Sequence, residues 1–146
     1  MNGAHLHLIV NHVSLFALVT GAIALAVSMK TKSNDLRRVA TVLFLVAGVF
    51  GWVAVETGEE AEEIVKALGG EYESFINEHT LAAAWAQRSG FLVSALAIAM
   101  EWAVRKKKNW VKPLQWILLV AALHACTVFG RTAFLGGLIR HTEIRN

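Results

Sequence analysis

The sequence predicts an all-α fold, an integral membrane bundle of four helices in up-down-up-down order with both termini outside. Three observations lead to this fold class. Hydrophobic residues make up 55% of the 146 residues, and charged residues only 17%. Four apolar stretches each approach the roughly 20 residues that a membrane-spanning helix needs. The basic residues gather in two of the three connections, as they do in the cytoplasmic loops of membrane proteins.

Each apolar stretch is expected to form one span of a single domain, residues 1–146. Ser33, Asn34 and Asp35 are candidate caps for the second helix, and the fourth helix is expected to begin after Pro113 or with that proline in its first turn. The second helix is expected to continue beyond the membrane and to stop at the glycine pair Gly69-Gly70. Short connections favour antiparallel neighbours. The predicted spans cover about 5–29, 37–57, 80–104 and 113–137.

Two basic connections determine the predicted orientation. The segments "KTKSNDLRR" and "RKKKNWVK" hold nine of the fourteen lysines and arginines, which places them in the cytoplasm. Both termini and the 57–80 segment then face outward, to the periplasm if the membrane is a bacterial inner (plasma) membrane. The net charge of +3 reflects this topology. Without a basic patch interleaved with aromatic residues, no nucleic-acid binding is predicted.

The histidines form the most informative polar pattern. None of the six falls on the predicted cytoplasmic side. His5 and His12 are seven residues apart and share one face of the first helix, whereas His7 points elsewhere. His124 and Arg131 are also seven apart and share a face of the fourth helix. Because an imidazole inside hydrocarbon is costly and usually functional, His12 and His124 are candidate functional residues.

Two imidazoles at similar depth on different helices suit the axial positions of a b-type haem. His12 is the first predicted ligand. Similar depth in the membrane favours His124 as its partner. The diagonal arrangement of the first and third helices favours His79 instead. Gly48 and Gly51 form a small-residue stripe where another helix or a flat ligand can approach. The cationic side chains predicted to pair with the haem propionates are Arg88, Arg131 and Arg140.

This pattern predicts a membrane-embedded electron-transfer protein or redox-complex subunit, similar to a b-type cytochrome, with its site near the outer face. An electron carrier or subunit is favoured over a stand-alone enzyme, because the sequence has no nucleophile paired with a base. The expected partners are the lipid bilayer, quinone, redox-complex subunits, an external electron carrier and a second copy of the chain.

Two alternatives stay open at this point. The second alternative is a structural accessory subunit whose histidines are packed or solvated, and in which Arg88 forms an ion pair with Glu56 or Glu59.

The first alternative is a non-haem protein that binds or transports a transition-metal ion. Imidazole and carboxylate groups near the outer face suit iron, manganese, zinc or copper. The ligands predicted for this metal site are His12, His79, His141, Glu59 and Glu63.

Three motifs give the chain a resemblance to a family of small four-span bacterial membrane proteins. The motifs are Asn-His near the start, Thr-Gly-x-x-Ala-Glu-Glu after the second span, and Gly-Gly-x-Ile-Arg-His-x-Glu-Ile at the end, with a histidine beginning the third helix. The resemblance implies no particular activity, but it favours His12 with His79 and gives His141 a role. The motif residues are Asn11, His12, Thr57, Gly58, Ala61, Glu62, Glu63, His79, Gly136, Gly137, Arg140, His141 and Glu143.

Overall fold

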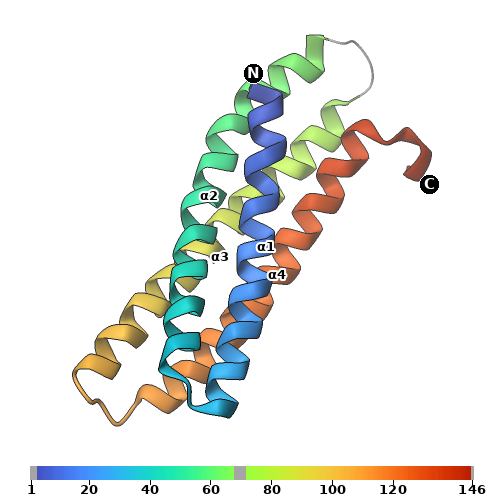
Figure 1. The fold of residues 1–146 in the computed structure, drawn as a ribbon. Helices are drawn as coiled ribbons and strands as arrows, with labels where there is room; N and C mark the ends of the chain where they lie inside the picture. The colour runs from blue at the N-terminus through green and yellow to red at the C-terminus, as the bar shows by residue number, and fades with distance from the viewer. Residues whose placement is uncertain (1–2, 68–71, 146) are drawn as a thin grey trace.

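The computed structural model describes residues 3–67 and 72–145, which form a bundle of long antiparallel helices (Figure 1). The helices are α1 (Gly3–Thr31), α2 (Asn34–Ala67), α3 (Glu73–Arg105) and α4 (Val111–Arg140), followed by the short 3-10 turn η1 (Thr142–Ile144). One end of the bundle holds both chain termini together with His7 and His79, and we call it the histidine end. The other end holds the α1–α2 and α3–α4 turns with Lys32 and Lys107, and we call it the lysine end.

All four helices are long and apolar enough to cross a membrane. The predicted all-helical bundle with four candidate spans is therefore confirmed. Every helix extends beyond its predicted span, because the polar residues at the ends continue the helical turns. Helix α2 runs through the acidic segment to Ala67, and the predicted stop at Gly69-Gly70 lies outside the described residues. Helix α3 begins at Glu73, so the segment ahead of His79 belongs to one continuous helix.

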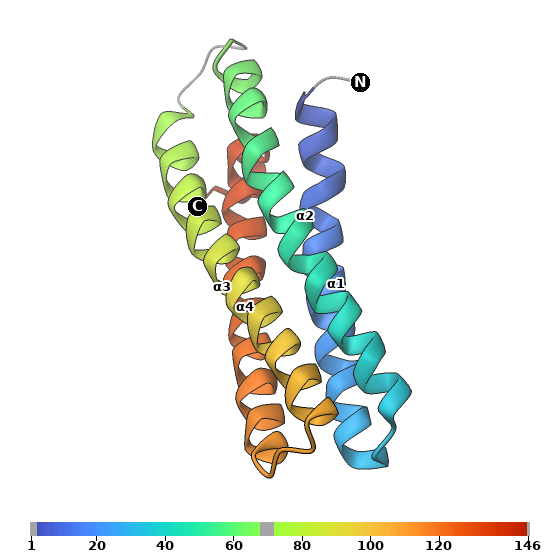
Figure 2. The ribbon, with the colours of Figure 1, turned by 90° about the vertical axis from the view of Figure 1, so that its left-hand side faces the viewer.

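The helices form a ring in chain order. Consecutive helices pack against each other, and α4 closes the ring against α1. In Figure 2, α1 lies beside α2 along its length, and α3 lies beside α4. The molecule is therefore two antiparallel hairpins placed face to face, with α1 and α3 on one diagonal and α2 and α4 on the other.

The interior consists of apolar side chains, and so does much of the outside. The fully buried large side chains include Leu18, Leu25, Phe44, Val93, Met100 and Leu118. Large apolar side chains on the surface, such as Phe16, Leu81 and Val120, are each more than 60% exposed. A surface of this kind is costly in water, whereas lipid hydrocarbon accommodates it. The distribution of apolar residues is thus compatible with an integral membrane protein.

Small residues bring α2 and α3 into close contact at the centre of the bundle. A Cβ atom added at Gly90 would lie 3.7 Å from Cα of Gly48, and one added at Gly48 would clash with the Ser94 hydroxyl. That hydroxyl donates a hydrogen bond to the Phe44 carbonyl (2.9 Å) across the interface. The small-residue stripe therefore receives a neighbouring helix, one of the two occupants that the sequence predicted for it.

The turns at the lysine end follow the expected capping chemistry. The Ser33 hydroxyl accepts a hydrogen bond from the Leu36 backbone (3.3 Å), which confirms Ser33 as the cap of α2. Lys32 follows the end of α1, and Lys107 lies just beyond the end of α3. Both have a left-handed backbone, with φ of 57° and 50°. Glycine or asparagine is the usual residue at such positions. Pro113 lies in the first turn of α4, one of its two predicted positions.

Candidate functional site

Two histidines meet inside the histidine end of the bundle. His7 comes from α1 and His79 from α3, so the rings approach each other across the diagonal, one from each hairpin. Their centroids are 6.2 Å apart, and their planes are nearly perpendicular at 84°. Both side chains are partly buried. The diagonal arrangement of helices 1 and 3 expected from the sequence therefore holds for His79, but the ring opposite it is His7.

Backbone carbonyl groups fix the orientation of both rings. Nδ1 of His7 lies 2.8 Å from the Ala54 carbonyl oxygen on α2, and Nδ1 of His79 lies 3.0 Å from the Thr132 carbonyl oxygen on α4. Because a carbonyl oxygen only accepts, each Nδ1 must carry the proton, which leaves the Nε2 lone pair of the neutral ring free. Metal-bound histidines are oriented in this way in proteins.

A glycine lies beside each ring, but only the one beside His79 is needed to make room. A Cβ atom added at Gly58 of α2 would lie 3.5 Å from Cε1 of His7. A Cβ atom added at Gly136 of α4 would lie 3.0 Å from Cε1 of His79, closer than ordinary packing allows. The adjacent Gly137 has no heavy atom within 4 Å of an added Cβ. Only the first glycine of this pair is thus required by the position of the histidine.

Below the two rings, the interior contains polar atoms without partners. Asn11 lies one turn along α1 from His7, and its Oδ1 atom is buried without a hydrogen bond in the described structure. The same holds for the hydroxyl of Ser14, which is fully buried. Both residues share the inward face of α1 with His7, at spacings of four and seven. The Phe129 ring packs between Gly51 and Gly90, and a Cβ atom added at Gly51 would lie 3.7 Å from the Ser14 hydroxyl.

The structure places His12 and His124 on the outside of the bundle. Both side chains are exposed, and Nδ1 of His12 bonds to the Leu8 carbonyl oxygen of its own helix at 2.7 Å. The reason is the helical period, because His5 and His12 share a face, as predicted, but this face points away from the other helices. The predicted pairs of His12 with His124 or His79 are therefore not brought together in the interior.

The three arginines predicted to bind propionates are also exposed. The Arg88 guanidinium lies over the Trp85 ring, 5.1 Å from its centroid, on the outer surface of α3. Its predicted ion-pair partner Glu56 instead accepts a hydrogen bond from the Trp52 indole (3.0 Å). Arg131 and Arg140 lie on the outer surface of α4, the latter in its last turn.

The predicted non-haem metal ligands do not converge. Among residues 3–67 and 72–145, no three histidine, cysteine, aspartate or glutamate side chains are grouped so that they could hold a metal ion. Glu59 and Glu63 are exposed on α2. His141 pairs with Glu143 beyond α4, with Nδ1 2.7 Å from the carboxylate oxygen. Of the five predicted ligands, only His79 lies inside the bundle, because the others are on outward faces of their helices or beyond α4.

Sequence reasoning missed His7 as the inward-facing histidine of α1. A signal for it exists, because His7, Asn11 and Ser14 are spaced as one polar stripe on a helix that is otherwise apolar. Of the motif residues, Asn11, Gly58, His79 and Gly136 all lie in or beside this site.

Two imidazoles from different helices are a donor set that occurs at the axial positions of haem iron. With metal–nitrogen bonds of about 2 Å, two imidazoles on opposite sides of one ion have centroids roughly 6 Å apart. The porphyrin supplies the four remaining ligands of a haem iron, so two histidines complete its coordination. Comparisons with protein-family models, with curated proteins and with solved structures find no match to this chain. The interpretation of the site therefore rests on its own geometry.

Proposed function

We propose that this protein binds one b-type haem between His7 and His79 and acts as a membrane electron-transfer protein or redox-complex subunit. A single observation carries the proposal. The centroids of two imidazoles from different hairpins lie 6.2 Å apart with nearly perpendicular planes, and each ring is held through Nδ1, which leaves Nε2 available to a ligand. A haem bound there supplies a reversible one-electron couple.

The chain's own residues contribute position and polarity. The carbonyls of Ala54 and Thr132 hold the two rings and increase the basicity of their free nitrogens. Gly58 and Gly136 present no side chain beside the two rings. The partnerless Oδ1 of Asn11, one turn deeper, offers a hydrogen-bond acceptor to a water or a polar group entering this space.

The proposal includes the membrane setting. We place the lysine end in the cytoplasm, because most lysines and arginines lie in its two turns. The histidine end then faces the periplasm of a bacterial inner membrane, where quinone, another redox subunit or an external carrier exchanges electrons with the site. Arg131 and Arg140, both exposed on α4, are candidate propionate partners on this side, once the side chains reorient.

Optical spectroscopy tests this function. The protein is expressed in a haem-replete bacterial host and purified in detergent. We expect a Soret band that shifts on reduction with dithionite, and one haem per chain in the pyridine haemochrome assay. A colourless preparation from such a host overturns the proposal.

Matched asparagine variants identify the ligands. Asparagine can keep the donor at the position of Nδ1, so His7→Asn and His79→Asn preserve the bonds to the Ala54 and Thr132 carbonyls while they remove Nε2. Each variant is expected to lose at least nine tenths of the haem. His12→Asn and His124→Asn serve as controls and should keep it. Loss of haem in the controls alone would restore the ligand pair that the sequence predicted.

A structural role is the second candidate, and the same hydrogen bonds favour it. The His7–Ala54 bond joins α1 to α2, and the His79–Thr132 bond joins α3 to α4, so each imidazole ties its hairpin together. In that case the protein is colourless, and the asparagine variants unfold at nearly the same temperature as the unaltered chain. Alanine variants, which lack the donor, would unfold earlier.

A further inference from the structure

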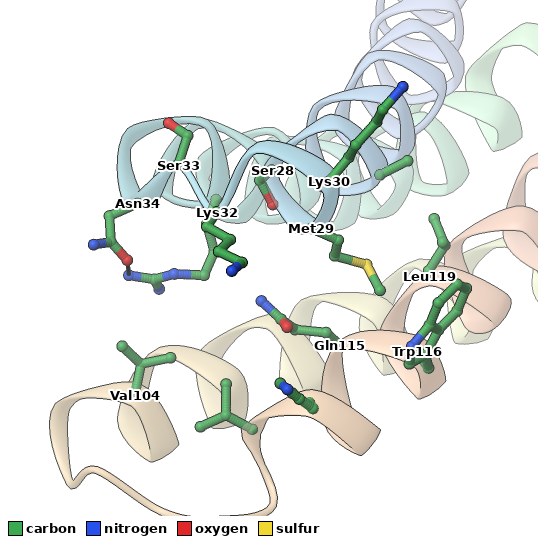
Figure 3. Close-up of a pocket in the computed structure, with 14 residues that line it drawn as sticks. Ser28, Met29, Lys30, Lys32, Ser33, Asn34, Val104, Gln115, Trp116 and Leu119 are labelled. Carbon is green, nitrogen blue, oxygen red and sulfur yellow. Dashed lines mark hydrogen bonds between the residues drawn. The ribbon is translucent and has the colours of Figure 1, made fainter.

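A cavity at the lysine end lies far from the two histidines. It has a volume of about 650 Å³ and lies between the ends of all four helices, where the two hairpins separate. This volume is within the range of about 300–1,000 Å³ that is typical of small-ligand sites. Figure 3 shows the cavity between the α1–α2 turn and the beginning of α4.

The lining of the cavity is basic. Among the described residues that line it, four are lysines or arginines and none is acidic. The charge of Arg37 is already neutralised, because its guanidinium pairs with Glu101. Lys30, Lys32 and Lys112 have no ion-pair partner within the described part of the chain. In Figure 3 the Lys32 ammonium and the Gln115 amide point into the space, whereas Lys30 points away from it.

One wall of the cavity is apolar and continues onto the outer surface of the helices. Met29, Trp116 and Leu119 form this wall. Trp116 is 62% exposed, and Val120 farther along α4 is 63% exposed. A molecule with a long hydrocarbon chain can therefore extend from the cavity along this apolar face. A tryptophan at the level of lipid headgroups is typical of membrane interfaces.

We infer that this cavity is a binding site for the headgroup of an anionic phospholipid. Lys32 and Lys112 attract the phosphate, Gln115 offers amide donors to its oxygens, and an acyl chain follows the wall of Met29, Trp116 and Leu119. Basic cavities between membrane helices on the cytoplasmic side are suited to such headgroups. A small soluble anion would use the lysines but not the apolar wall. The inference is independent of the haem proposal, because the two sites lie at opposite ends of the bundle.

The test compares Lys32 and Lys107, the two lysines whose backbone lies in the left-handed region. Lys32→Gly and Lys107→Gly each remove one charge at the lysine end, and glycine suits the backbone at both positions. Only Lys32 lines the cavity. Adding Lys112→Gln to the first variant and Lys106→Gln to the second gives a matched pair of double variants. Glycine favours these backbone conformations, so neither lysine-to-glycine change is expected to impair folding.

Native mass spectrometry in detergent measures the dissociation constants of phosphatidylglycerol, of phosphatidylcholine with the same chains, and of inorganic phosphate. We expect one tightly bound phosphatidylglycerol per chain and at least tenfold weaker binding of phosphatidylcholine. Each cavity lysine near the lipid phosphate is worth on the order of fivefold in affinity, so the Lys32/Lys112 double variant should bind roughly 30-fold more weakly. The Lys107/Lys106 variant should bind within about twofold of the unaltered protein.

Three results overturn the inference. Equal binding of the two lipids means that the cavity does not recognise a net negative headgroup. Equal weakening in both double variants means that binding follows the overall charge of the lysine end. Displacement of the lipid by low millimolar inorganic phosphate means that the ligand is the free anion and that the apolar wall contributes nothing.

Discussion

The histidine end and the lysine end both place polar groups inside the bundle, but they satisfy them differently. At the lysine end the buried Arg37 pairs with Glu101, and the Thr41 hydroxyl lies 3.1 Å from the same carboxylate. Charge and hydrogen bonds are thus completed within the chain. At the histidine end two imidazoles leave Nε2 free, and Asn11 leaves its Oδ1 without a partner in the described structure.

This difference separates polar residues that hold the bundle together from those that are ready for a ligand. Buried polar groups in native proteins are nearly always paired, and an unpaired one costs about 1–3 kcal/mol. Such a cost inside a membrane protein is expected only where something else meets the group. The comparison therefore predicts that breaking the Arg37–Glu101 pair acts on stability, whereas replacing His7 or His79 acts on ligand binding.

The largest effect on stability is expected from breaking the buried ion pair. Glu101→Leu leaves the Arg37 guanidinium buried and unpaired, which should destabilise the protein by about 3–5 kcal/mol. Arg37→Met combined with Glu101→Leu removes both charges and should recover most of this loss. Unfolding by denaturing detergent in mixed micelles measures the free energy of unfolding of both variants. Equal destabilisation by the single and double variants would mean that the pair does not hold α2 and α3 together.

Two adjacent glycines sharpen the comparison at the histidine end. Gly136→Ala brings a methyl group against the His79 ring, which should destabilise the apoprotein by about 1–3 kcal/mol and reduce haem occupancy. Gly137→Ala meets nothing within 4 Å and should stabilise α4 by about 0.5–1 kcal/mol, because alanine restricts the unfolded chain. Thermal unfolding and haem content are measured for both. A change in stability of the same sign in both variants would contradict the close contact between Gly136 and the His79 ring.

A pair of serines tests the significance of the unpaired atoms. Ser14→Ala removes a buried hydroxyl that has no partner, so the ligand-free protein should gain about 1 kcal/mol of stability. Ser94→Ala removes a hydroxyl that donates a hydrogen bond to the Phe44 carbonyl between α3 and α2. The protein should lose a similar amount of stability. Detergent-induced unfolding provides both values. A loss of stability in Ser14→Ala would reveal a hydrogen-bond partner, such as a bound water, at this hydroxyl.

The smallest effect is expected in the α1–α2 turn. Lys32 adopts φ of 57°, a left-handed conformation that costs a non-glycine residue roughly 1 kcal/mol. Lys32→Gly should therefore raise the thermal unfolding temperature by a few degrees, with Lys32→Ala as the control that keeps the strain. If both variants unfold at the same temperature, the turn is not strained by its side chain.

The overall fold could be predicted from the sequence, because its cause is simple. Four apolar runs separated by polar turns leave few arrangements for the chain. Local rules limited the cap of α2 to three adjacent residues, of which Ser33 is the cap, and placed Pro113 at or just before the start of α4. The close contact at Gly48 was also foreseeable, since small residues let membrane helices approach.

The candidate site was less predictable, and α1 shows why. This helix is apolar on every side, so hydrophobic periodicity does not indicate which face turns inward. The choice between His7 and His12 thus depended on the short polar stripe of His7, Asn11 and Ser14, a weaker signal than hydrophobic periodicity. The Arg37–Glu101 pair was hidden for a similar reason, since its partners are 64 positions apart. The resemblance to a four-span family stays a prediction.

Electron paramagnetic resonance of the oxidised protein tests the central claim most directly, because it reports the axial ligands of the iron. The account predicts a low-spin signal with two imidazole ligands, lost in His7→Asn and in His79→Asn and retained in His12→Asn. A protein without haem, or a two-imidazole signal that survives both of the first two substitutions, would contradict it.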